Sequence, residues 1–128
     1  MGTRSNIGKL DNDGNVKYLY CQFDGYVEHV GVTLSKYYTE EATILELLSM
    51  GDMSSLNESV LTSVFYMRDM EEDDCSARVV SLQEYTDTNK DHVAYKYLHQ
   101  DGEWYMRSCY LPETWRKVSE VIKEGDTE

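Results

Sequence analysis

The first third of the chain alternates apolar and polar residues in two short runs. Residues 3–10 (TRSNIGKL) and 16–23 (VKYLYCQF) flank a polar segment, Asp11 to Asn15, that contains Asp-Gly. Two alternating runs around such a segment are typical of an antiparallel β-hairpin. Side chains alternate between the two faces of a strand. The second run therefore divides into a candidate core face and a more polar aromatic face, which are Leu19, Cys21 and Phe23 against Tyr18, Tyr20 and Gln22.

A second pair of runs near the end of the chain predicts another hairpin. Residues 93–99 (VAYKYLH) and 103–110 (EWYMRSCY) flank Gln100-Asp101-Gly102. Residues 60–68 (VLTSVFYMR) are rich in β-branched and aromatic types, which favours a further strand. A short strand is expected near 78–80, and residues 52–59 are expected to form a loop.

The best-marked helix follows Thr39. Ile44, Leu47 and Leu48 recur at helical spacing, which predicts one apolar stripe facing the core. Thr39 is expected to cap the helix, and acidic residues in the first turn favour its start because they oppose the helix dipole. Gly51 is the expected stop.

Three weaker helices are also predicted. A short one ends near Tyr38, and a second follows Ser81, which forms a capping-box pattern with Glu84. Pro112 is a favoured first residue for the last helix. The apolar stripe of that helix would be Trp115, Val118 and Ile122.

These elements predict an α+β fold. The expected architecture is a mostly antiparallel sheet of about six strands with three or four helices packed on one face. Residues 1–128 would form a single domain whose tail frays from about residue 125. A linker between domains is not expected, because the chain has one proline and no low-complexity stretch.

The charge narrows the classes of partner. The formal net charge is −12, which disfavours direct binding to DNA or RNA because phosphate backbones are repelled. The acidity serves solubility, or complements a partner with a basic surface. The acidic residues are most concentrated at 69–74 (DMEEDD). A solvated loop is the favoured interpretation of this segment, and a cation site is the alternative.

The cysteines and the hydropathy indicate a cytoplasmic protein. The three cysteines are far apart and include no CxxC pair, which favours reduced thiols. No apolar run is long enough for a signal peptide or a membrane span. Cys21 lies on the candidate core face and is expected to pack rather than react. No cofactor or resident metal is predicted.

The segment after the first hairpin holds the most concentrated candidate chemistry. Asp24, Tyr26, Glu28 and His29 occur within six residues. A carboxylate beside an imidazole suits general-base chemistry, and the same groups can ligate a metal. A tight turn followed by a helix start explains them equally well. Neighbouring helical residues point about 100° apart, so Glu28 and His29 do not converge by default.

Arg4 and Ser5 are the other candidate ligand-binding residues. Both can donate hydrogen bonds to an anion or a nucleotide. Counting outward from the first turn places them opposite residues 21–23, and thus at the same end of the sheet as Asp24 and His29. The sequence contains neither a nucleophile elbow nor a phosphate-binding loop.

Tyrosine dominates the aromatic residues, with 11 Tyr against two Trp and two Phe. Tyrosine is enriched at interfaces because it joins an apolar ring to a polar hydroxyl. If their strand faces abut, a platform for a partner or for a homodimer would consist of Tyr18, Tyr20, Tyr95 and Tyr97. A half-buried sheet surface is the alternative.

Several segments along the chain form a recognisable set of motifs: MGTRSNIG at the start, YCQFDGYVEHVG at 20–31, GDMSSL at 51–56, Tyr66–Asp69 and DGEWY at 101–105. Together they resemble a family of small uncharacterised proteins encoded by bacteriophages and bacteria. The family pattern has histidine, tryptophan and proline where this chain has Gln22, Phe23 and Val27. The resemblance implies a phage origin and action inside an infected bacterium. It implies no established activity.

Three functions follow as hypotheses. The first is a non-enzymatic phage accessory protein that binds a host protein, in host takeover or counter-defence. The second is a binder of a small ligand, such as a nucleotide signal, near Arg4, Asp24 and His29. The third is a metal-assisted hydrolase that uses Asp24, Glu28 and His29.

Overall fold

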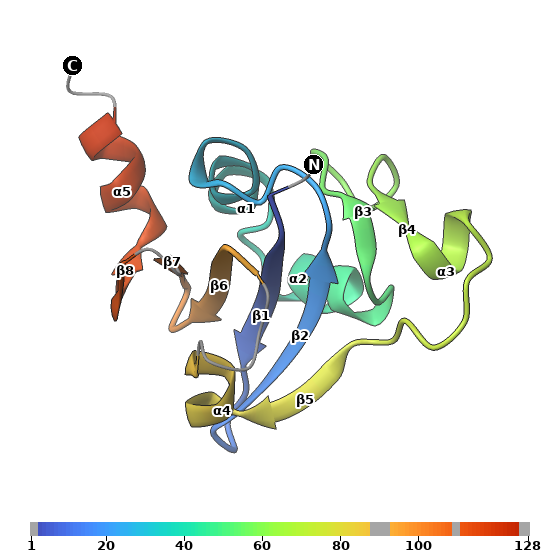
Figure 1. Cartoon of the computed structure of the whole chain (residues 1–128), viewed down its shortest axis with the longest axis horizontal. Helices are drawn as coiled ribbons and strands as arrows, with labels where there is room; N and C mark the ends of the chain where they lie inside the picture. Colours follow the sequence, from blue (N-terminus) through green and yellow to red (C-terminus); the bar gives the residue numbers. More distant parts are fainter. Residues whose placement is uncertain (1–2, 88–92, 109–110, 126–128) are drawn as a thin grey trace.

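The computed structural model describes residues 3–87, 93–108 and 111–125 (Figure 1). The elements, in chain order, are β1 (Ser5–Leu10), β2 (Asn15–Cys21), the π-helical turn η1 (Val27–Gly31), α1 (Val32–Tyr37), α2 (Glu41–Ser49), β3 (Met53–Ser55), β4 (Val64–Phe65), α3 (Tyr66–Asp69), β5 (Arg78–Ser81), α4 (Leu82–Thr86), β6 (Tyr95–Gln100), β7 (Glu103–Ser108), β8 (Leu111–Lys117) and α5 (Val118–Gly125). The α+β class predicted from the sequence is confirmed.

Within the described residues, eight strands form one sheet in the order β4-β3-β2-β1-β6-β7-β8, and β5 pairs with β2. Most pairs are antiparallel, as predicted, but β1 is parallel to β6 and β2 is parallel to β3. The sheet is therefore mixed and has more strands than expected. The additional strands are β3, in a segment predicted to be a loop, and β8, in a segment predicted to be helical.

Both predicted hairpins are confirmed, and local turn chemistry explains them. The Asp11 carboxylate accepts hydrogen bonds from the backbone N–H groups of Asp13 and Asn15, at 2.8 and 2.9 Å. In the second hairpin, Asp101 and Gly102 both have positive φ, at 52° and 78°. Two central residues in that region define the turn whose twist matches a two-residue hairpin.

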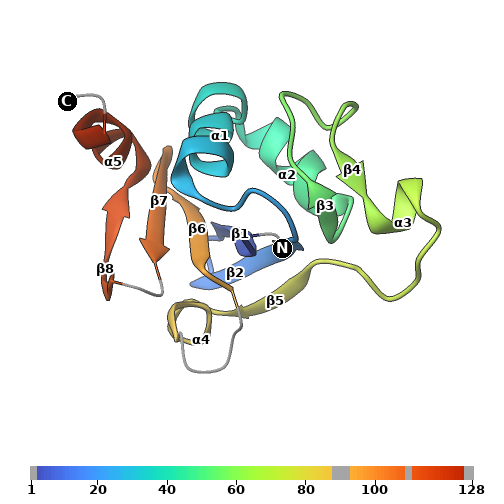
Figure 2. The same cartoon turned by 45° about the horizontal axis from the view of Figure 1, so that its top comes forward.

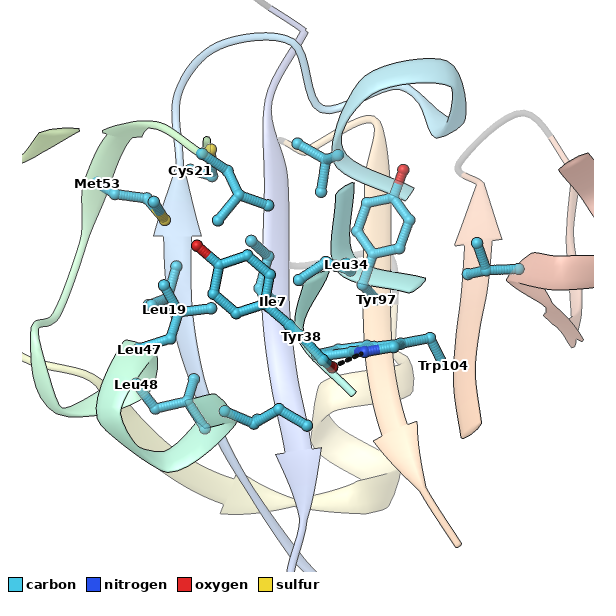
Figure 3. Close-up of a cluster of buried hydrophobic side chains, with 14 of the residues drawn as sticks. Ile7, Leu19, Cys21, Leu34, Tyr38, Leu47, Leu48, Met53, Tyr97 and Trp104 are labelled. Atoms are coloured by element: carbon cyan, nitrogen blue, oxygen red, sulfur yellow. Dashed lines mark hydrogen bonds between the residues drawn. The ribbon is translucent and has the colours of Figure 1, made fainter. Parts of the chain in front are cut away.

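The sheet carries a hydrophobic cluster on each face. The larger cluster includes Ile7, Leu19 and Tyr97 and is covered by η1, α1, α2 and α5 (Figure 3). The smaller cluster includes Val16, Tyr85 and Leu98 and is covered by α4. Figure 2 shows α1 and α2 on one side of the sheet and α4 on the other. The prediction that all helices pack on one face is therefore wrong: α4 follows β5, which pairs with β2, and buries Tyr85 against Val16 and Leu98 on the opposite face.

Three local predictions were wrong. The Thr39 cap is absent: α2 begins at Glu41, and its N-cap residue, Glu40, makes no side-chain cap bond. The strand predicted over 60–68 is limited to Val64–Phe65. Only these residues pair with β3, and the composition of a segment does not determine how much of it finds a pairing partner. Pro112 lies in β8 rather than opening a helix. β8 ends the strand order, where a missing N–H is tolerated.

Ser81 behaves as predicted. Its hydroxyl accepts a hydrogen bond from the N–H of Glu84 at 3.1 Å, which caps α4. Among the described residues, no helix has the length and apolar character needed to cross a membrane.

Candidate functional site

The turn that joins β2 to η1 is built on Gly25. Its N–H donates to the Thr3 carbonyl at 2.8 Å, and the Tyr97 hydroxyl donates to the Gly25 carbonyl at 2.6 Å. A Cβ at Gly25 would lie 2.7 Å from the Thr3 oxygen and 2.8 Å from the Ser5 side chain, so glycine is required. Burial raises the pKa of Tyr97 well above its ordinary value, and its proton stays on the hydroxyl. The turn is thereby fixed to the end of the sheet.

The four predicted site residues of this segment lie on and beside that turn. Asp24, Tyr26 and Glu28 are exposed, and the Tyr26 hydroxyl donates to Asp24 Oδ1 at 3.4 Å. The nearby Asp24 charge raises the pKa of Tyr26. His29 is half-buried in η1, and its Nε2 lies 3.0 Å from the Leu56 carbonyl. A carbonyl can only accept, so Nε2 carries the proton and holds the ring on the loop after β3.

Arg4 and Ser5 do not share a site. Ser5 is fully buried opposite Cys21, on the face of the larger cluster, whereas Arg4 is exposed. Successive strand residues point to opposite faces. The predicted register of Ser5 against Cys21 is confirmed. The structure does not bring Ser5 and Arg4 together around one ligand, because the alternation separates them.

The acidic and histidine side chains do not converge. Among the residues described, no group of three His, Cys, Asp or Glu side chains lies close enough to hold a metal ion. Residues 71–74 are exposed along the segment that follows α3. The hydrolase hypothesis needs Asp24, Glu28 and His29 to form such a group, and the geometry supplies none.

Cys21 is fully buried in the larger cluster, where burial raises the pKa of its thiol to about 12. A thiol with that pKa is almost entirely protonated near neutral pH and is a poor nucleophile. Cys21 is therefore a packing residue.

The four tyrosines proposed as one platform lie on opposite faces of the sheet. Tyr95 and Tyr97 belong to the larger cluster, and Tyr97 is fully buried. Tyr18 packs on Tyr85 in the smaller cluster, with ring centroids 5.1 Å apart. The prediction of a shared platform is therefore wrong. β1 lies between β2 and β6, and its pairing with each of them places Tyr18 and Tyr97 on opposite faces of the sheet.

A polar clamp at the outer edge of β2 was not predicted. β5 pairs with β2 up to Tyr18 and β3 pairs with it at Cys21, which leaves the N–H of Tyr20 between them. The buried Asp52 carboxylate accepts from that N–H at 2.8 Å. Asp52 also accepts from both terminal nitrogens of Arg78, at 2.9 and 2.7 Å. Asp52 and Arg78 are 26 positions apart, so no local sequence pattern could predict the clamp.

Replacing Asp52 with alanine is expected to lower the free energy of unfolding by about 2 kcal/mol, because a buried backbone donor loses its acceptor. The ion pair adds little, since the Arg78 side chain is 43% exposed. Asp52→Asn keeps an acceptor for Tyr20 and should lose about 1 kcal/mol or less. Urea denaturation of both variants measures the difference, and an equal loss would contradict the role assigned to the Tyr20 bond.

The segment 57–77, which we call the acidic lobe, exposes apolar side chains beside its carboxylates. Leu61 is 82% exposed, Met70 48% and Met67 39%. The lobe contains β4 and α3 and extends from the β3 edge of the sheet (Figure 1). Exposed apolar residues near charged groups are a feature of protein-binding surfaces.

Fold and surface together define the chain as an acidic α+β protein with an exposed apolar and acidic lobe. No protein-family model, curated protein or solved structure matches the chain.

Proposed function

We propose that the chain is a non-enzymatic binding protein whose partner is another protein, and that the acidic lobe makes the contact. The observation that carries the proposal is the 82% exposure of Leu61 on a turn that is held rigidly. A large apolar side chain exposed on a fixed turn is a suitable anchor for a partner's pocket, because little backbone entropy of the turn is lost on binding.

Arg68 supplies the rigidity. Its Nη1 donates to the Val60 carbonyl at 3.1 Å, and its Nη2 donates to the carbonyls of Leu61 and Ser63 at 3.3 and 2.7 Å. The hydrogen bond from Arg68 holds the pKa of Asp69 below its usual range, so Asp69 stays charged and holds the guanidinium in place.

Side-chain bonds within the turn add to this. The Asn57 amide donates to the Thr62 carbonyl at 2.8 Å, and the Ser63 hydroxyl donates to the Ser59 carbonyl at 2.8 Å. Leu61 therefore lies on a turn whose backbone is held by hydrogen bonds from Arg68 and from side chains within the turn.

Charge limits the kind of partner. Glu71, Glu72, Asp73 and Asp74 are exposed and follow Met70 directly. A surface that combines exposed leucine and methionine with four carboxylates complements a partner whose apolar pocket has a basic rim. Such a partner associates quickly at low salt and more slowly as salt screens the charges.

The resemblance to phage-encoded proteins suggests where the partner occurs. A phage accessory protein acts inside its host, so a host protein with a basic surface is the partner that we propose. Host takeover or counter-defence is the role that this implies.

Affinity capture from bacterial lysate, with the full chain as bait, tests the proposal. Leu61→Ser should lose the captured protein, whereas the matched control Leu45→Ser should retain it, because Leu45 is 48% exposed on α2, outside the lobe. Glu71→Lys combined with Glu72→Lys should slow association and reduce its dependence on salt. Equal capture by Leu61→Ser and wild type, or no specific capture by wild type, would overturn the proposal.

A further inference from the structure

A row of polar side chains crosses four neighbouring strands on the α4 face of the sheet. Asn6 is paired with Tyr20 on β2 and with Lys96 on β6, and Lys96 is paired with Arg107 on β7. Directly paired residues project from the same face. The Lys96 ammonium reaches the Tyr85 carbonyl of α4, which identifies the face. Figure 1 shows β2, β1, β6 and β7 side by side.

Lys96 places a fixed positive charge in the middle of this row. It is 2% exposed, and its Nζ donates to the carbonyls of Tyr85 and Asp87 at 2.6 and 2.8 Å. The ammonium also lies 5.5 Å from the centroid of the Tyr85 ring. These contacts hold the Lys96 ammonium in a fixed position on this face of the sheet.

Arg107 stands directly opposite Lys96. In the part of the chain that the structure describes, no carboxylate forms an ion pair with Arg107, and its Nε is buried with no hydrogen-bond partner. A buried donor without an acceptor costs free energy, and an anion bound here would supply the missing acceptor.

Asn6 adds an unused amide to the row. It is 4% exposed, and its side chain makes no hydrogen bond to any described residue. Buried side-chain amides are normally hydrogen-bonded. Arg4, two residues before Asn6, is exposed at the same end of the strand. Three basic residues and one amide thus occupy one area of a chain whose net charge is −12.

We infer that Asn6, Lys96 and Arg107 form a binding site for the phosphate group of a small ligand. The Arg107 fork can donate two parallel hydrogen bonds to phosphate oxygens, and the Asn6 amide can donate a third. A phosphate beside Arg107 gives its guanidinium the charge partner that it lacks among the described residues. This site is separate from the acidic lobe and does not depend on it.

Phosphate titration of the full-length chain tests the site, with sodium chloride at matched ionic strength as the salt control. Inorganic phosphate and pyrophosphate should each raise the unfolding temperature of the wild type. Arg107→Gln should bind phosphate about tenfold more weakly, the effect of losing charge-assisted hydrogen bonds. Lys17→Gln removes an exposed cation elsewhere on β2 and should bind like the wild type.

A second readout separates ligand binding from a structural role. Without phosphate, Arg107→Gln should unfold at the same temperature as the wild type or higher, because the substitution removes a buried donor that has no acceptor. In the wild type, phosphate should shift the amide NMR signals of Asn6 and Arg107 before those of other residues. Equal phosphate affinity of Arg107→Gln and Lys17→Gln, or NMR shifts confined to other residues, would overturn the inference.

Discussion

Replacing Gly51 with alanine is expected to lower the free energy of unfolding by about 3 kcal/mol, the sum of a conformational cost and a steric one. Gly51 ends α2 with φ at +81°, a region that L-residues with a Cβ rarely adopt. An added Cβ would also overlap the carbonyl oxygen of Cys75. That carbonyl accepts from the N–H of Asp52 at 2.6 Å, so it cannot move aside without disturbing the clamp on Tyr20.

Gly102→Ala is the matched control for this prediction. Gly102 has nearly the same φ, +78°, but no atom lies within 4 Å of the position of its added Cβ. Its loss should be the conformational cost alone, about 1 kcal/mol. Urea denaturation of both variants gives the comparison. Equal losses of stability in Gly51→Ala and Gly102→Ala would contradict a steric contribution from the Cys75 carbonyl.

Trp104→Ala is expected to cost about 3–5 kcal/mol, the range for truncating a buried large aromatic residue. Trp104 is 4% exposed in the larger cluster, and its Nε1 donates to the Tyr38 carbonyl at 2.8 Å (Figure 3). Truncation leaves a cavity and also removes the donor from a buried carbonyl. The loss of stability would be measured by chemical denaturation followed by circular dichroism.

Trp104→Phe separates the two contributions. Phenylalanine fills most of the space but cannot donate to Tyr38, so its loss should lie between those of wild type and Trp104→Ala. A loss for Trp104→Phe equal to that of Trp104→Ala would mean that the hydrogen bond, rather than packing, dominates at this position.

The proposed lobe and the proposed phosphate site lie on different elements, which makes their tests independent. Leu61 lies between β3 and β4, whereas Arg107 lies on β7. Leu61→Ser should leave phosphate binding unchanged, and Arg107→Gln should leave capture of the partner protein unchanged. If phosphate altered partner capture, the two surfaces would be coupled through the sheet, because β1 and β2 connect them.

Much of the fold could be predicted because its signals are local. Asp-Gly turns fixed both hairpins, Ser81 fixed the start of α4, and the spacing of Ile44, Leu47 and Leu48 fixed the buried side of α2. Each of these depends on residues a few positions apart, where backbone preference and side-chain periodicity decide the outcome.

The candidate site could be predicted only in part. Asp24, Tyr26 and His29 do lie together, since they belong to one turn and the helix that follows it. Ser5 was placed at the correct register but on the buried side. A register counted from a turn gives the partner of a strand residue, whereas the surroundings of its face depend on which helices pack there.

The sequence by itself determined the class, the hairpins, the buried stripe of α2 and the excess of negative charge. Only the tertiary structure decided that β1 runs parallel to β6, which sets Asn6 beside Lys96 and separates Tyr18 from Tyr97. It also decided that Asp52 fills the gap between β3 and β5. These contacts join residues far apart in the chain. They form because burial and hydrogen bonding in the assembled sheet outweigh the entropy of closing long loops, a balance that no local pattern records.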